Sequence, residues 1–284
     1  MSPPDRNKRI GPSLLRHWPV PLQRGDKDAR GTVLIVAGAP QLPGPVLLSA
    51  ISALRAGAGK LQIATAPEIV LHIGTAIPEA LVVPFSQARE CAEHADAVVF
   101  GPGIDPSDET SALLRTLLQT SKARFLIDAG GLSVLGSDPQ MLHGAAHLPV
   151  LTPHAGELSA MLGAERDSIA SDPLSYLQRA IQTFEAVVAL KGRSTHIAAP
   201  GTPVYENLTG HDGLATSGSG DTLAGIGGGL LARGADPLQA AVWAVYLHAT
   251  AGKRLGSRIG VGFLAREIPA AIPAILRELS SAKR

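Results

Sequence analysis

Short apolar runs that each end in glycine, proline or polar residues recur along the chain, and they constrain its fold most. The clearest runs are residues 32–37, 61–64, 97–100, 124–127 and 186–190. A parallel strand buried on both faces reads as a continuous apolar run of this kind. Helix-like stretches at 46–56, 110–119 and 174–184 separate the runs. This alternation, with no linker-like break, predicts one α/β domain with a mostly parallel sheet.

The ends of the chain differ from this pattern. Residues 1–30 are polar and rich in proline and arginine. We expect them to form an N-terminal arm that packs on the domain, loose over 2–9 and with a short helical turn over 14–18. The domain itself is expected over residues 31–284, and the apolar stretches 237–254 and 263–279 are predicted to be helical cover.

Composition excludes several classes of protein. The formal net charge is +1, which implies no strong attraction to nucleic acid or membranes. The single cysteine, Cys91, excludes an intrachain disulfide framework and fits a reducing compartment. The first ten residues do not resemble a secretory signal, and no apolar run approaches the ~18 residues of a membrane span. Abundant alanine and glycine suit close packing of helices on a sheet.

The loops after the predicted strands are candidates for the edge of a binding site, because ligands of parallel α/β sheets bind beyond the carboxyl ends of the strands. Residues 38–45 and 101–103 supply glycines there, and none forms a dinucleotide fingerprint. Pro45 is expected in the first position of the next helix. Asp128 follows another strand and either fixes its loop or belongs to the site.

The glycine-rich stretch 207–225 is the strongest functional signal. Gly218, Ser219 and Gly220 precede an apolar, helix-like run, and Asp221 lies among them. Glycine allows a ligand to approach the backbone closely, and a helix that begins near Gly220 would direct free N–H groups at a phosphate. A carboxylate repels such an anion, so its expected role is proton abstraction. The alternative is a glycine-rich turn with an ordinary N-terminal carboxylate.

Two further polar turns follow predicted strands. In residues 152–157, Thr152 is predicted as the N-cap, and His154 and Glu157 share one face of the first turn. His154 would bond a ligand and Glu157 would hold water around a cation, or Glu157 caps the backbone. Residues 191–195 combine positive charge with hydroxyls, which suits a nucleotide, whereas a solvated turn is the alternative. His248 is interpreted as a core or groove histidine.

Six segments together resemble the NAD(P)H-hydrate dehydratases of the ribokinase-like superfamily, from about residue 31 to residue 252. They are GAPQLPGPVLLSAISALRAGAGK at 38–60, VVFGPGI at 98–104, LIDAGG at 126–131, TPHAGE at 152–157, KGRST at 191–195 and NLTGHDGLATSGSGDTLAG at 207–225. The resemblance implies a three-layer ribokinase-like fold, with helices on both faces of the sheet. It also implies repair of the S epimers of NADHX and NADPHX, hydrated forms of the reduced nicotinamide cofactors, by a hydro-lyase. ADP or ATP phosphorylates the ring hydroxyl, and loss of phosphate restores the double bond.

The resemblance also assigns roles to residues. Asp221 would be the base, with Gly218, Ser219 and Gly220 stabilising the transferred phosphoryl group. The nucleotide would bind Gly220 and residues 191–195, namely Lys191, Gly192, Arg193, Ser194 and Thr195. The hydrated cofactor would contact Pro45, Gly103, His154 and Asp221. Pro45 stands where the family usually has alanine, and proline lacks the N–H for a backbone contact. Glu157 would order Mg²⁺ through water.

Further expectations follow from the same resemblance. The protein would be cytoplasmic, a homotetramer, and linked to an NAD(P)HX epimerase encoded separately, because the chain is too short to include that domain. Two alternatives remain at this level. One is a hydroxyethylthiazole or sugar kinase of the same fold, which would retain a phosphorylated product. The other is an inactive nucleotide-binding sensor, which would not need Asp221.

Overall fold

The strands of the central sheet are short and apolar, as the sequence predicts. In the computed structural model, which describes residues 7–21, 25–136 and 138–280, they form one ten-stranded sheet. The strands are β1 (Lys8–Arg9), β2 (Thr32–Val36), β3 (Lys60–Thr65), β4 (Ala80–Pro84), β5 (Ala97–Phe100), β6 (Arg124–Ile127), β7 (Val150–Leu151), β8 (Val187–Leu190), β9 (Thr195–Ala198) and β10 (Tyr205–Asn207).

Helices occupy most of the chain between these strands. They are α1 (Pro12–His17), α2 (Gly44–Arg55), α3 (Val70–Ala76), α4 (Ala88–Glu93), α5 (Asp108–Thr120), α6 (Gly130–Leu135), α7 (Ala155–Leu162), α8 (Arg166–Ser171), α9 (Pro173–Phe184), α10 (Ser219–Ala232), α11 (Pro237–Ile259) and α12 (Ile268–Ser280). Short 3₁₀ turns cover Pro67–Ile69, Phe85–Gln87, Pro139–Gly144, Asp212–Leu214 and Ala265–Glu267. None of the helices within the described ranges is long and apolar enough to cross a membrane.

The sheet is mostly parallel and has the order β1-β10-β9-β8-β7-β6-β5-β2-β3-β4. Every pairing from β8 to β4 is parallel, whereas β9 runs antiparallel to β8 and to β10. The chain leaves β2 toward β3 and β4 and then returns to β5 on its other side. The carboxyl ends of β2 and β5 therefore form a topological switch point, where ligands of such sheets bind.

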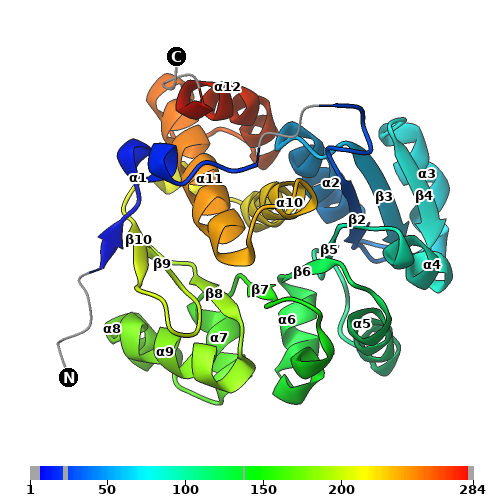
Figure 1. Ribbon diagram of the computed structural model, residues 1–284, viewed down its shortest axis with the longest axis horizontal. Helices are drawn as coiled ribbons and strands as arrows, with labels where there is room; N and C mark the ends of the chain where they lie inside the picture. The colour runs from blue at the N-terminus through cyan, green and yellow to red at the C-terminus, as the bar shows by residue number, and fades with distance from the viewer. Residues whose placement is uncertain (1–6, 22–24, 137, 281–284) are drawn as a thin grey trace.

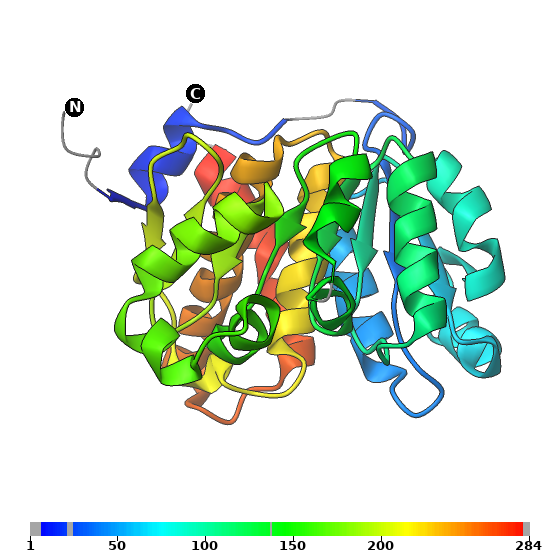
Figure 2. The same ribbon diagram turned by 90° about the horizontal axis from the view of Figure 1, so that it is seen from below.

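Helices cover both faces of the sheet, so the molecule has three layers (Figure 1). Alternate residues of each central strand enter different cores: Val33 and Ile35 of β2 face one, and Leu34 and Val36 face the other. The first core includes α1, α2, α3, α10, α11 and α12, and the second includes α4 to α9. Seen from below, the helices that pack on the second core lie in front of the strands (Figure 2). Cys91 is buried in the second core.

The glycines of α10 allow this helix to approach its neighbours very closely. A Cβ on Gly228 would lie 2.1 Å from a methyl group of Val99 in β5, and one on Gly225 would lie 2.1 Å from the carbonyl oxygen of Ser49 in α2. Such distances exclude a side chain. The abundant glycine therefore serves the close packing of helices on a sheet that the composition predicts. It allows α10 to lie between α2 and the sheet (Figure 1).

The N-terminal segment packs more tightly than predicted over its described part. The prediction of a loose arm is wrong for Lys8 and Arg9, because they pair with Tyr205 and Glu206 of β10; residues 2–6 lie outside the described residues. The helical turn near 14–18 is confirmed as α1. The carbonyl oxygen of Trp18 then accepts a 2.8 Å hydrogen bond from the indole of Trp243 in α11.

Candidate active site

The carboxyl ends of β6, β7 and β8 meet the N-terminus of α10 around a cavity of about 950 Å³. These ends bring Asp128, His154 and Lys191 to one edge of the sheet. The backbone N–H of Lys191 donates to the carbonyl oxygen of Pro153 over 2.7 Å, which ties two of the loops together. Three polar stretches that are far apart in sequence therefore line one cavity.

The first turn of α10 presents backbone N–H groups at this cavity. Gly218 is its N-cap, with φ of 87°, a conformation that favours glycine. A Cβ there would also lie 2.4 Å from Leu48 Cδ1. The N–H groups at the start of this helix and the positive end of its dipole make the turn suitable for a phosphoryl group, and the N–H of Ser219 also donates to the carbonyl oxygen of Thr216 over 3.2 Å.

His248 of α11 holds that turn from behind. Its Nε2 lies 2.9 Å from the carbonyl oxygen and 3.0 Å from Oγ of Ser219. Burial lowers the pKa of His248 to about 4, against the carbonyl of Ser219 that raises it, so the ring is neutral. A neutral ring with its proton on Nε2 donates to Ser219 and fixes the backbone of the turn. Sequence analysis placed His248 in a core or groove and missed this contact, because its partner is distant in sequence.

A buried carboxylate and a lysine stand opposite the turn. Asp128 is 2% exposed, and its Oδ1 accepts from Thr152 Oγ1 over 2.7 Å and from Lys191 Nζ over 2.8 Å. Lys191 Nζ also lies 3.5 Å from Oε2 of Glu157. Burial lowers the pKa of Lys191, but the two carboxylates outweigh it and the net pKa is raised, so Lys191 is a fixed cation. Asp128 therefore both fixes its loop and lines the cavity, so the two roles that the sequence offered as alternatives occur together.

Asp221 has an altered acidity in this setting. Burial, and then the charge of Asp128, raise the pKa of Asp221 to about 6, with Lys191 opposing and Glu157 adding to the shift. A carboxylate with such a pKa accepts a proton more readily than an ordinary aspartate and remains ionised at neutral pH. A perturbed carboxylate beside an anion-binding turn has the arrangement of a general base.

The turn after β7 caps its helix, which corrects one prediction. The N-cap of α7 is His154 and not Thr152, whose hydroxyl is bonded to Asp128. His154 Nδ1 accepts from the N–H of Gly156, and Glu157 accepts from the N–H of His154 over 2.7 Å. Glu157 therefore caps the backbone, as one of the two interpretations predicted, and the imidazole of His154 remains exposed at the cavity.

The described part of the chain offers a magnesium ion no cage of protein ligands. No group of three or more His, Cys, Asp or Glu side chains among the described residues has the geometry to hold a metal. Oε2 of Glu157 is also close to Lys191. These residues would fit only an ion that arrives with nucleotide phosphates and keeps its water.

Most of the predicted site residues line the cavity, and three do not. Present are Asp221, Gly218, Ser219, Gly220, Lys191, Gly192, Arg193, Thr195, His154 and Glu157. Ser194 lies outside this lining. Gly103 and Pro45 lie at the switch point instead, where a Cβ on Gly103 would be 2.9 Å from Pro45 Cγ. Pro45 is the second residue of α2, because the helix begins one residue earlier than predicted.

Known proteins resemble the chain along its length. The family described as NAD(P)H-hydrate dehydratase matches residues 33–274. The chain belongs to the NAD(P)H-hydrate dehydratase family. A relative from Xanthomonas campestris, named ADP-dependent (S)-NAD(P)H-hydrate dehydratase, is 42% identical over 96% of this chain and 98% of its own length. The bifunctional NAD(P)H-hydrate repair enzyme Nnr of Moorella thermoacetica is 34% identical over 90% of this chain, which spans 51% of that enzyme.

Solved structures of the family share the fold. The ADP/ATP-dependent NAD(P)H-hydrate dehydratase from Bacillus subtilis, co-crystallised with ATP and Mg²⁺, superposes with a TM-score of 0.87. It is 28% identical, and the match covers 96% of this chain and 99% of that one. The ribokinase-like fold predicted from the sequence is thereby confirmed.

Proposed function

We propose that this protein is a hydro-lyase that uses ADP to dehydrate the S epimers of NADHX and NADPHX to NADH and NADPH. The observation that carries the proposal is the carboxylate of Asp221, with a pKa raised to about 6, in the glycine-rich first turn of α10. Membership of the dehydratase family and the 42% identical ADP-dependent relative support the substrates and the phosphoryl donor.

In the proposed reaction Asp221 takes the proton of the hydroxyl on the hydrated ring. The oxygen then attacks the terminal phosphoryl group of the nucleotide, and the N–H groups of Gly218, Ser219 and Gly220 stabilise its charge. AMP is released from the ADP donor. Phosphate then leaves the ring carbon as the neighbouring carbon loses a proton, and the double bond re-forms between these two carbons. His154 and Gly103 are proposed to contact the hydrated cofactor from the side of β5 and β7.

The nucleotide is proposed to lie in the large cavity, along residues 191–195. Lys191 and Arg193 supply positive charge there, and Arg193 is exposed and free to reach phosphates. Mg²⁺, carried by the phosphates, would offset their charge during transfer. Glu157 is proposed to contact the ion through water.

A spectroscopic assay tests the proposal directly. Purified protein with Mg²⁺, S-NADHX and ADP is expected to restore the absorbance of reduced nicotinamide and to release one phosphate per NADH. ATP in place of ADP measures the preference between donors. A phosphorylated product without regained absorbance would identify a kinase instead. Nucleotide binding with neither product would identify a sensor.

The pH dependence of turnover follows from Asp221. The base works only when ionised, so kcat/KM, which reports ionisations of the free enzyme, is expected to rise with pH through an inflection near 6 and to level off above pH 7. A kcat/KM that stays nearly constant down to pH 4.5, as expected for a base with the ordinary aspartate pKa of 3.8, would contradict the environment described for Asp221. The measurement is a profile of kcat/KM from pH 4.5 to pH 8.

Three wider proposals complete this function. We propose a cytoplasmic location, where the reduced cofactors are used, and a homotetrameric assembly. We also propose that a separate NAD(P)HX epimerase supplies the S epimer; a dehydratase that works without an epimerase is the alternative. The bifunctional name and double length of the Moorella thermoacetica relative are consistent with that partner. Size-exclusion chromatography with light scattering tests the assembly.

A further inference from the structure

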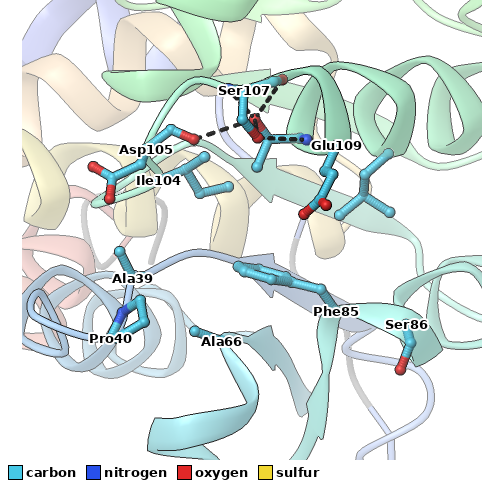
Figure 3. A pocket seen from close by; sticks show the side chains of 12 residues that line it. Ala39, Pro40, Ala66, Phe85, Ser86, Ile104, Asp105, Ser107 and Glu109 are labelled. Atoms are coloured by element: carbon cyan, nitrogen blue, oxygen red, sulfur yellow. Dashed lines mark hydrogen bonds between the residues drawn. The ribbon is translucent and has the colours of Figure 1, made fainter.

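A second cavity, of about 390 Å³, opens at the same edge of the sheet. Its walls come from the loops after four neighbouring strands: Ala39 follows β2, Ala66 follows β3, Phe85 follows β4 and Ile104 follows β5 (Figure 3). None of these four residues has a role in the site described above. The position is the topological switch point, where a ligand is expected.

The second cavity adjoins the active site through the glycines of the first loops. The N–H of Gly38, which lines the cavity, donates to the carbonyl oxygen of Pro102 over 2.8 Å. A Cβ on Gly103 would lie 3.4 Å from Gly38 Cα and 2.9 Å from Pro45 Cγ. Leu48, one turn further along α2, contacts the position of a Cβ on Gly218.

The separation suits the two ends of one dinucleotide. Asp128 follows β6, and β5, β2 and β3 come next in the sheet. At about 4.8 Å per strand spacing, the second cavity lies roughly 10–15 Å from Asp128. An extended dinucleotide bridges such a distance through its pyrophosphate, so a ring at Asp221 places the other half of the molecule near this cavity.

The side chains that line this second cavity indicate which kind of chemical group it binds. The ring of Phe85 and the side chain of Ile104 face each other across it, and both are apolar (Figure 3). Such a slot fits a flat, uncharged ring. The carboxylates of Asp105 and Glu109 stand on the wall formed by the 104–113 segment, and Glu109 points toward Phe85 (Figure 3).

The charge of the lining is one-sided. Among the described residues that line this cavity there are two carboxylates and no lysine, arginine or histidine. Carboxylates accept hydrogen bonds from the hydroxyls of a ribose and repel a phosphate on it. The loop that carries them is fixed, because Ser107 and Thr110 form a capping box and Thr110 Oγ1 donates to the carbonyl oxygen of Asp105.

We propose that this cavity binds the adenosine end of the hydrated dinucleotide, and that Asp105 and Glu109 make NADHX the preferred substrate over NADPHX. The inference rests on the proposed function and adds a subsite to it. ADP is the other source of adenosine, but its phosphates need the cationic groups of the large cavity, which holds Lys191 and Arg193.

Substrate competition tests the carboxylates. The wild type is expected to show a kcat/KM for NADHX about tenfold above that for NADPHX at low salt, with the ratio falling as salt rises. Glu109→Gln and Asp105→Asn are each expected to raise kcat/KM for NADPHX about threefold. Asp108→Asn is the matched control: it removes an acidic group from the same first turn of α5 but does not line the cavity. Equal values for both substrates in the wild type would overturn the proposal, as would an effect of Asp108→Asn as large as that of Glu109→Gln.

A truncated substrate tests the subsite itself. The hydrated form of reduced nicotinamide mononucleotide lacks the adenosine half, so its KM is expected to exceed that of NADHX at least tenfold. Phe85→Ala is expected to raise the KM for NADHX severalfold and to leave the KM for the mononucleotide unchanged. A change confined to the KM for ADP would place the nucleotide in this cavity and contradict the proposal. Turnover of none of the three hydrated substrates would contradict the proposed function instead.

Discussion

Replacing Asp221 with asparagine is expected to lower kcat by about 10³-fold or more, because the amide keeps the shape of the side chain but cannot accept a proton. The dissociation constant for ADP is expected to stay equal or to fall, since the lost charge would have repelled the phosphates. Steady-state kinetics and isothermal titration calorimetry measure the two effects. Turnover near that of the wild type would remove Asp221 from the mechanism.

The same substitution is expected to stabilise the fold. The folded-state pKa of Asp221, about 6, lies above its ordinary value of 3.8, so the folded protein binds this proton more tightly than the unfolded chain does. The residue therefore lowers stability above pH 6, and this loss disappears as the pH falls from 6 to below 4. Asp221→Asn is expected to raise the free energy of unfolding at pH 7.5 by up to about 3 kcal/mol.

The matched control for this variant is Asp212→Asn. Asp212 is an exposed carboxylate that lines the same cavity, and no catalytic role is assigned to it. It is expected to keep kcat within about twofold and stability within about 0.5 kcal/mol of the wild type. Urea unfolding at pH 7.5 and pH 4.5 separates the two carboxylates, because the gain of Asp221→Asn is expected to be clearly smaller at the lower pH.

Replacing Lys191 with methionine is expected to cost about 3 kcal/mol of stability, because it removes the cation from the buried carboxylate of Asp128. It is also expected to weaken ADP binding tenfold or more through loss of positive charge in the cavity. Lys191 lowers the pKa of Asp221, so the inflection of the kcat/KM profile is expected to move above 6. Urea unfolding, calorimetry and the pH profile measure these effects.

A double-mutant cycle isolates the pair. Asp128→Asn together with Lys191→Met removes the buried carboxylate of Asp128 along with its cation, so the double variant is expected to be more stable than Lys191→Met alone. Its weak ADP binding is expected to persist, because the lysine is still absent. Lys191→Met with the stability of the wild type would show that the ion pair does not hold the loops together.

Several parts of the site could be predicted from the sequence because each of them depends on a local pattern of residues. The glycines at 218 and 220, next to Asp221 and before an apolar run, predict the N-terminus of a helix at a binding site. In the structure α10 begins at Ser219. The polar turns at 152–157 and 191–195 follow buried strands, and parallel strands bring their carboxyl ends to one edge. The N-cap of α7 was misplaced, because the hydroxyl of Thr152 is bonded to Asp128 from another strand.

The order of apolar strands and helices by itself determined the α/β fold, since each segment must bury its apolar face whatever its neighbours are. It also determined which stretches carry functional groups. Only the tertiary structure decided how those groups act: the acidity of Asp221 arises from burial and from Asp128, which lies 93 positions earlier in the chain. The support of Ser219 by His248 and the cavity between Phe85 and Ile104 likewise depend on elements that meet only in the folded chain. Charges and packing act through space, so no local pattern in the sequence records them.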